Sequence, residues 1–139
     1  MTGTAPPFDD LKRGHVVLAS DPFKPDNDMT RPWVVVNNES HPFDKQQYVV
    51  MGLTTQTWYD ERIPLGLDEY RHRKAPRESS IIPHAVASLE PALMTDYVCR
   101  IDDAPLNRAV ETLVGYLYSR DTEQCDHKKL TTCRRLSGL

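Results

Sequence analysis

The segment RPWVVVNNESHPFDKQQYVVMGLTTQ, residues 31–56, decides the fold of this 139-residue chain. It holds two runs rich in β-branched and aromatic residues, WVVVN (33–37) and QYVVMGLTT (47–55), separated by a polar turn. Such runs are typical of β-strands, and the second is apolar almost throughout, which predicts a central strand of a sheet. Pro32 opens the first run, where its missing N–H costs little.

Further runs of strand type lie on both sides of this segment. They are HVVLAS (15–20), ERIPLGL (61–67), SSIIPHAVASL (79–89) and DYVCRID (96–102). The run over 61–67 is predicted as an edge strand because it contains a proline, and the run over 79–89 is interrupted by Pro83. The polar segments 20–32 and 70–78 are predicted as loops.

One amphipathic helix is predicted near the C-terminus, over residues 104–119. Asp103 is a suitable N-cap, and Pro105 falls in the first turn, where a missing N–H is harmless. Helical spacing predicts a buried stripe of Leu106, Val110, Leu113 and Leu117. Together these elements predict a mostly β (α+β) fold, a small barrel of five to seven short strands with a C-terminal amphipathic helix.

The length and composition predict one domain. Hydrophobic residues make up 39% of the 139-residue chain, which is enough for one core. We expect the domain to span residues 12–119. Residues 1–11, with paired prolines, are predicted as a flexible N-terminal arm, and residues 120–139 as a polar C-terminal tail.

The charge balance excludes a protein that binds nucleic acid through bulk positive charge. Lys and Arg number 17 against 20 Asp and Glu, which gives a formal net charge of −3. No apolar stretch approaches the ~18–20 residues of a membrane span, and no signal peptide is visible. The three cysteines are too few for a disulfide framework, so we expect a cytoplasmic protein.

No common cofactor motif stands out in the sequence. The six glycines form no phosphate-binding loop, and there is no HExxH, paired CxxC or GxSxG pattern. Cys125, His127 and Cys133 form a C-x-H-x5-C pattern in the tail. A zinc site normally needs four ligands with tighter spacing, so we expect neither a metal nor another cofactor.

Two junctions between loop and strand are candidates for chemistry. Arg31 precedes a proline that fixes the chain direction, so its guanidinium can present a fork to a phosphate. By position alone, a surface arginine that caps a strand or pairs with a nearby aspartate is the favoured interpretation. The strand over 47–55 ends in Thr54, Thr55 and Gln56, which place hydroxyls and an amide at a strand terminus. An ordinary turn rich in Thr is the alternative there.

A basic and aromatic loop is the third candidate. It contains Arg71, Arg73, Lys74 and Arg77 beside Tyr70 and His72. Backbone charge and stacking faces are what single-stranded nucleic acid uses, although a solvated charged loop explains the same residues.

These motifs, in this order, resemble the MazF/PemK family of toxin endoribonucleases of type II toxin–antitoxin systems. KRGHVVLASDPF (12–23) is similar to the family's opening strand, which begins with a basic-Gly pair. TRPWVVVNNES (30–40) is similar to its R-P-x-[LV]-V-[LV] strand, and VVMGLTTQ (49–56) to its strand ending in Thr. SSIIPHAVASLE (79–90) and the late helix complete the resemblance, which covers about residues 12–118.

The resemblance implies an SH3-like barrel that forms a homodimer and cleaves single-stranded RNA at short sequences without a metal. It also implies a cognate antitoxin as protein partner, and a complex with that antitoxin that binds DNA. The family pattern implies that Arg31 and Thr54 are catalytic. Residues expected to bind RNA or support the site are Thr55, Gln56, Arg71, Arg73, Lys74, Arg77, Ser80 and His84.

The chain departs from the family pattern at three positions. Ala87 stands where many members have an arginine, His84 stands near the usual glutamate, and His15 replaces an acidic residue. We therefore hypothesise that His84 or His41 supplies a proton-transfer group, since histidine titrates near neutral pH. The missing arginine leaves an alternative function, a catalytically degenerate SH3-like barrel that binds RNA or protein.

Overall fold

The computed structural model describes residues 4–21, 29–58, 60–75 and 77–118, and its strands form one antiparallel sheet of seven strands. The strand order is β4-β6-β3-β2-β1-β7-β5. The strands are β1 (His15–Ser20), β2 (Thr30–Val35), β3 (Tyr48–Thr54), β4 (Ile63–Pro64), β5 (Tyr70–His72), β6 (Ser80–Leu89) and β7 (Met94–Ile101).

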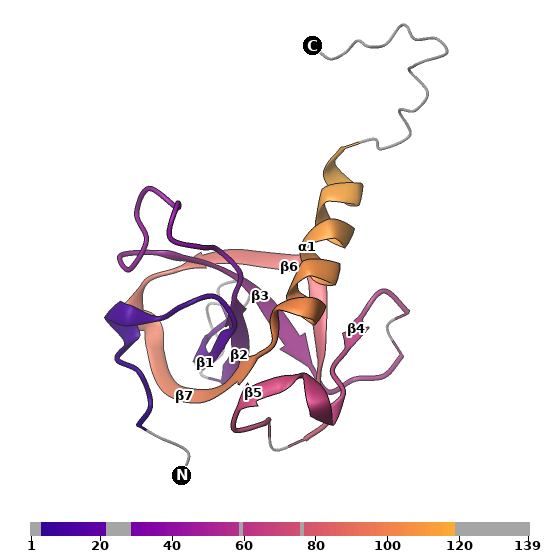
Figure 1. Cartoon of the computed structure of the whole chain (residues 1–139), viewed down its shortest axis with the longest axis horizontal. Coiled ribbons are helices and arrows are strands. Elements are labelled where there is room, and N and C mark those ends of the chain that lie inside the picture. Colours follow the sequence, from indigo (N-terminus) through magenta and orange to yellow (C-terminus); the bar gives the residue numbers. More distant parts are fainter. Residues whose placement is uncertain (1–3, 22–28, 59, 76, 119–139) are drawn as a thin grey trace, which may run out of the picture.

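The sheet curls into a half-barrel, with one α-helix, α1 (Asp103–Leu117), beside it (Figure 1). This confirms the predicted mostly β fold with a C-terminal helix. β3 lies between β6 and β2, away from both edges, as its apolar sequence predicts. β4 is an edge strand, also as predicted. β5 is a correction: the segment 70–78 is predicted as a loop, but Tyr70 pairs with Ile101 and His72 with Arg100 on β7.

A wide bulge at Pro83 bends β6. Met51 of β3 pairs with Val86, whereas the next residue, Gly52, pairs with Ile82. Residues 83–85 therefore have no partner in β3, and the proline interrupts no pairing with that strand. The Pro83 interruption predicted from the sequence is thus a bend inside one continuous strand rather than a break between two.

Two apolar clusters pack on opposite faces of the curled sheet, because neighbouring residues of a strand point to opposite sides. Val34 belongs to the cluster that includes Leu106 and Ala109 of α1. Trp33 and Val35 belong to the other cluster, together with Tyr48. We call the second one the Trp33 cluster. Its remaining buried members are Leu11, Val17, Ala19, Val50, Leu89 and Met94.

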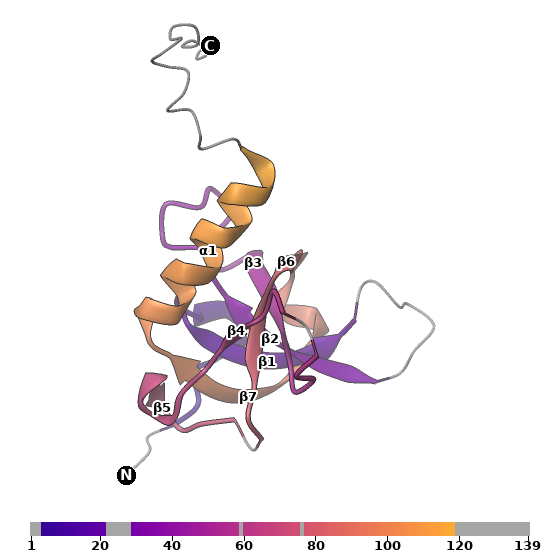
Figure 2. The same ribbon diagram turned by 90° about the vertical axis from the view of Figure 1, so that its right-hand side faces the viewer.

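Helix α1 covers only part of one face. Leu106 and Ala109 are buried and Val110 and Leu113 pack against them, but Leu117, predicted as part of the stripe, is 74% exposed. Figure 2 shows the reason, since the C-terminal end of α1 extends past the strands. The helix also starts one residue earlier than predicted, so Asp102 rather than Asp103 is the N-cap residue.

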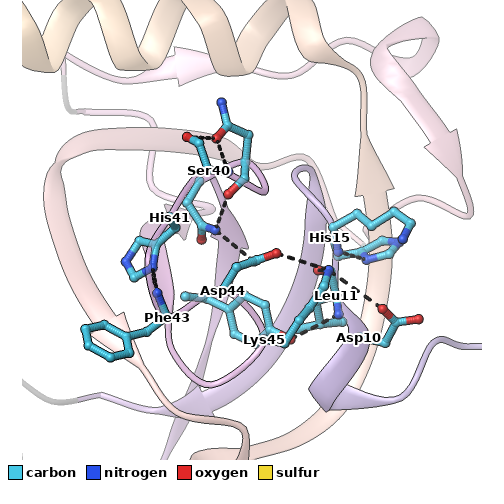
Figure 3. Close-up of polar contacts among 12 residues, drawn as sticks. Asp10, Leu11, His15, Ser40, His41, Phe43, Asp44 and Lys45 are labelled. Atoms are coloured by element: carbon cyan, nitrogen blue, oxygen red, sulfur yellow. Dashed lines mark hydrogen bonds and ion pairs between the residues drawn. The ribbon is translucent and has the colours of Figure 1, made fainter.

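The end of the predicted N-terminal arm packs onto the barrel. Leu11 is fully buried in the Trp33 cluster, and its N–H donates to the Tyr48 hydroxyl at 3.1 Å. Lys45, in the loop before β3, holds this segment in place. Its Nζ donates to the Leu11 carbonyl and contacts Asp10 and Asp44, each at 3.7 Å (Figure 3). The predicted boundary at residue 12 therefore leaves out a core residue. The predicted tail, 120–139, lies outside the described residues.

The pair Arg13-Gly14 connects three elements. The Gly14 N–H donates to the Val35 carbonyl at 2.8 Å, and the Gly14 carbonyl accepts from Ile101 N at 2.9 Å. Arg13 Nε donates to the Val36 carbonyl, and its Nη1 contacts Asp103 at 3.1 Å at the start of α1. Gly14 has φ +99, and a Cβ there would lie 2.6 Å from the Ile101 carbonyl oxygen.

We predict that Gly14→Ala destabilises the protein by about 2 to 4 kcal/mol, because it combines a left-handed backbone with an overpacked contact. The measurement is the free energy of unfolding in urea. Gly115→Ala is the matched control, since a Cβ at Gly115 meets no atom within 4 Å. Within a helix that change should stabilise by about 0.5 to 1 kcal/mol. Equal effects of the two substitutions would contradict the prediction.

Candidate functional site

Three polar side chains form a row across adjacent strands at one end of the sheet. Trp33 of β2 pairs with Gly52 of β3, and continuing that register by two residues places Arg31 opposite Thr54. Thr54 in turn pairs with Ser80 of β6. Residues opposite one another on neighbouring strands project to the same face. We call Arg31, Thr54 and Ser80 the polar row; it lies on the face of the Trp33 cluster, beyond its apolar end.

Arg31 is fixed in place by two partners. Its Nη1 donates to Asp21 Oδ2 at 3.2 Å, and its Nη2 donates to the Leu53 carbonyl at 3.4 Å. The Asp21 side chain is only 3% exposed, whereas that of Arg31 is 33% exposed. The buried aspartate therefore anchors the guanidinium, which stays partly accessible to solvent. The predicted ion pair with a nearby aspartate is present, and the Arg31 side chain is also partly exposed.

The Thr54 hydroxyl is oriented by the turn that follows β3. Its Oγ1 accepts a hydrogen bond from the Gln56 N–H at 3.0 Å. Because a hydroxyl has one proton and two lone pairs, this bond leaves the Thr54 proton available to a further acceptor. Thr54 and Ser80 are both buried, whereas Thr55 and Gln56 are exposed. The predicted Thr-rich turn is thus present and holds a strand-end hydroxyl.

A groove of about 200 Å³ adjoins the row at Ser80. Its walls come from the end of β3, from β4 and from the start of β6. It contains two charged side chains, Arg62 and Glu78, that the sequence analysis did not select. The other lining residues are Thr55, Thr57, Pro64, Leu65, Gly66, Ser79 and Ser80. The polar lining and both signs of charge suit a small polar ligand.

The basic loop contacts a different part of the molecule. Arg71 Nε lies 3.7 Å from Asp102, and the Arg73 guanidinium carbon lies 5.2 Å above the centre of the Tyr97 ring on β7. Lys74 and Arg77 are exposed. The Arg77 carbonyl accepts a hydrogen bond from Oγ of Ser79, a residue that lines the groove. Neither Arg71 nor Arg73 is among the residues that line the groove.

The two histidines proposed for proton transfer do not join the polar row. His84 lies in the β6 bulge, 6.5 Å between ring centres from Tyr116 of α1. His41 lies in the loop after β2, where its Nδ1 accepts from the Phe43 N–H (Figure 3). That loop follows Val35, at the opposite end of β2 from Arg31. Ala87, the position of the family arginine, packs against the Trp33 cluster.

His15 occupies a buried and positively charged environment. Burial, and then the charges of Arg100 and Lys12, lower its pKa from 6.5 to about 4. Its Nδ1 accepts from the Lys12 N–H at 2.9 Å, which requires an unprotonated Nδ1. Its ring meets Tyr97 edge-on at 5.6 Å. Where the family has an acidic residue, this chain therefore has a neutral structural imidazole.

Within the described ranges, no group of three or more His, Cys, Asp or Glu side chains is placed to hold a metal ion. Cys99 is buried, which raises the pKa of its thiol to about 12 and keeps it protonated. The C-x-H-x5-C pattern at residues 125–133 lies outside the described part of the chain. No helix in that part is long and apolar enough to cross a membrane.

Asp21, Arg62 and Glu78 are the site residues that sequence reasoning missed. Asp21 follows β1 directly and is one of the aspartates near Arg31 in the sequence, which is the signal that points to it. Arg62 and Glu78 flank β4 and β6, and only the pairing of Pro64 with Ser80 brings their segments together. Nothing in a single sequence reveals that pairing.

Comparison with known proteins gives a family and several similar folds. Residues 12–116 match the family model described as "PemK-like, MazF-like toxin of type II toxin-antitoxin system". An endoribonuclease from a mycobacterial species is 19% identical, with TM-score 0.57, covering 84% of this chain and 95% of its own. MazF from Deinococcus radiodurans is 14% identical, with TM-score 0.59, covering 83% and 98%.

A mycobacterial endoribonuclease in complex with its cognate antitoxin is also similar, at 19% identity and TM-score 0.59, covering 76% of this chain and 96% of that one. At these identities the likeness is one of fold. None of the curated protein sequences matches the chain.

We predict that the protein loses stability as the pH falls from about 6.5 towards 4. Above pH 6.5 His15 is neutral both folded and unfolded. Between the two pKa values the unfolded chain binds a proton that the folded chain excludes, which destabilises the fold by about 2 to 3 kcal/mol at pH 4.5. His15→Gln keeps an acceptor but does not titrate. Urea unfolding at pH 7 and 4.5 should show a smaller pH effect in this variant, and equal pH effects would contradict the assignment.

Proposed function

The chain belongs to the family of PemK-like and MazF-like toxins of type II toxin–antitoxin systems, and we propose that its polar row is the catalytic centre of an endoribonuclease for single-stranded RNA. The observation that carries the proposal is the register of β2, β3 and β6. It aligns an anchored arginine with a strand-end threonine and a serine beside a polar groove.

The proposed reaction needs no cofactor. The ribose 2′-OH attacks the adjacent phosphorus, so a 2′-O–P bond forms and the P–O5′ bond breaks. The products are a 2′,3′-cyclic phosphate and a free 5′-OH. One proton leaves the attacking hydroxyl and one is delivered to the departing oxygen, while the phosphoryl oxygens carry extra negative charge in the transition state.

Arg31 is proposed to stabilise that charge. A guanidinium is permanently protonated and offers parallel N–H donors that match two phosphoryl oxygens. Its anchorage to buried Asp21 means that little reorganisation is required when RNA binds. Asp21 is therefore a positioning residue, which acts on the RNA only through Arg31.

Thr54 and Ser80 are proposed to orient the scissile phosphate with their hydroxyls. The Gln56 N–H already occupies one lone pair of Thr54 Oγ1, so the hydroxyl proton is directed to another acceptor. Of the described residues that line the groove, Glu78 is the one that carries a carboxylate, a group that can serve as a general base. We assign it the removal of the 2′-OH proton, in place of His84 or His41.

The groove residues Thr55, Arg62 and Ser79 are proposed to hold the neighbouring nucleotide. Gln56 and His84 are proposed only as supporting residues, the latter through the bend of β6. Arg71, Arg73, Lys74 and Arg77 are proposed to bind the RNA backbone away from the cleaved bond, because Arg71 contacts Asp102, Arg73 lies over Tyr97, and none of the four lines the groove.

We further propose that the protein acts in the cytoplasm as a homodimer and that a cognate antitoxin inhibits it. A similar fold occurs in a mycobacterial endoribonuclease that is in complex with its cognate antitoxin, which supports this expectation. DNA binding by the toxin–antitoxin complex follows from the family resemblance. The degenerate binding module remains the second candidate, supported by Ala87, but Arg31 and Thr54 argue against it because neither is needed to form the sheet.

We predict that Arg31→Ala lowers the rate of RNA cleavage by about 100-fold or more, since it removes the main donor to the transition-state charge. Long single-stranded RNA is incubated with each protein in EDTA, and products are mapped by primer extension. Arg108→Ala is the matched control, because Arg108 is an exposed arginine of α1 that pairs with Glu69 and lies outside the row. It should cleave normally.

Arg31→Lys separates catalysis from folding. It keeps a positive charge beside buried Asp21, and so preserves the fold, but lacks the planar fork. We expect cleavage to fall with thermal stability close to that of the wild type. Equal cleavage by wild type and both Arg31 variants would contradict the role of Arg31. Failure of the wild type to cut RNA, with binding that weakens with salt, would favour the degenerate module.

A further inference from the structure

The two tryptophans of the chain occupy opposite environments. Trp33 is 0% exposed at the centre of the Trp33 cluster, whereas Trp58 is 68% exposed. Trp58 follows Thr54 by only four residues, in the segment that leaves the polar row. The exposed Trp58 ring offers a large aromatic surface to a ligand, directly after Thr57 of the groove in the chain.

Two consecutive hydrogen bonds connect Trp58 to the row. Its Nε1–H donates to Gln56 Oε1 at 3.2 Å, and the Gln56 N–H donates to Thr54 Oγ1 at 3.0 Å. Thr57, the residue before Trp58, lines the groove. The indole is therefore oriented relative to the Thr54 hydroxyl and lies next to the groove in the chain.

The chemistry that this indole offers to a ligand is that of an aromatic face. An indole has a single polar hydrogen, and here that hydrogen is directed at Gln56. The exposed part of the indole includes π surface, which cannot read hydrogen-bond patterns but stacks on any flat ring. Every nucleobase has such a face, and proteins that bind single strands use aromatic residues in this way.

We infer that Trp58 is a stacking platform for a base of the RNA strand, next to the nucleotide held in the groove. This inference rests on the proposed function, because it takes the polar row as the place of the scissile phosphate. A stacked base adds affinity without regard to its identity. Trp58 is thus a substrate-binding residue that contributes to KM and leaves the choice of cleavage sequence to other side chains.

Tryptophan fluorescence tests the inference without cleavage. The protein is titrated with a 2′-O-methyl oligonucleotide that spans a mapped cleavage site. This oligonucleotide lacks the attacking hydroxyl and therefore stays intact. Stacking should quench the exposed Trp58 in the wild type. In Trp58→Phe only buried Trp33 emits, and its emission should stay constant. Arg31→Ala, which cannot cut by the proposed mechanism, should still show the quenching.

Affinity and kinetics give the second readout. Trp58→Ala should weaken binding of the oligonucleotide about 5- to 100-fold, the range for loss of one stacked base, with Trp58→Phe between. KM should rise by a similar factor with kcat and the cut positions unchanged. Phe43→Ala is the matched control, since Phe43 is an aromatic residue 54% exposed in the loop after β2. It should bind like the wild type.

Three outcomes would overturn the inference. They are binding of the oligonucleotide without quenching, unchanged affinity in Trp58→Ala, and a Trp58→Ala defect confined to self-association or antitoxin binding, which would make Trp58 a protein contact. If Arg31→Ala still cuts RNA, the proposed catalysis fails, yet quenching and a weaker Trp58→Ala complex would still support the stacking role. Thermal denaturation of each variant verifies that the fold is intact.

Discussion

The close approach of the Gly14 backbone to β7 is the constraint on which the rest of the structure depends. At this residue the chain donates to β2 through Val35 and accepts from β7 through Ile101, so it joins the two neighbours of β1 at one point. The distance leaves no room for a Cβ. Arg13 then ties the start of α1 to the same junction. With β1 fixed between them, β2 has one register, and that register brings Arg31 opposite Thr54.

The sequence predicted the strands whose signal is local and missed features that depend on pairing. β1, β2 and β3 have long apolar runs, so their positions follow from composition alone. β5 is three residues of Tyr, Arg and His, which have no apolar pattern, and it forms because β7 offers it a free edge. Helical spacing predicts Leu117 in the buried stripe, but the helix extends past the sheet at this residue (Figure 2), so Leu117 has no strand to pack against and is exposed.

The candidate site divides in the same way. The family resemblance directed attention to Arg31 and Thr54, which stay a proposal as catalytic residues but do lie on adjacent strands. Asp21, which pairs with Arg31, and the groove residues Arg62 and Glu78 come from segments that meet only in three dimensions. His84 and His41 can transfer protons near neutral pH, but their places in the β6 bulge and the loop after β2 keep them outside the polar row. The net charge of −3 likewise describes the whole chain and not the local surroundings of Arg31.

The β6 bulge has a consequence for how this chain tolerates change. Residues 83–85 separate two halves of one strand: Ser80 pairs with Thr54 at the end of β3, and Val86 to Leu89 pair with the other end of β3. Because the two halves are aligned independently, an insertion or deletion within 83–85 can be absorbed there without sliding Ser80 past Thr54. Sequence changes in the half that contains Ala87 can therefore leave the pairing of Ser80 with Thr54 intact.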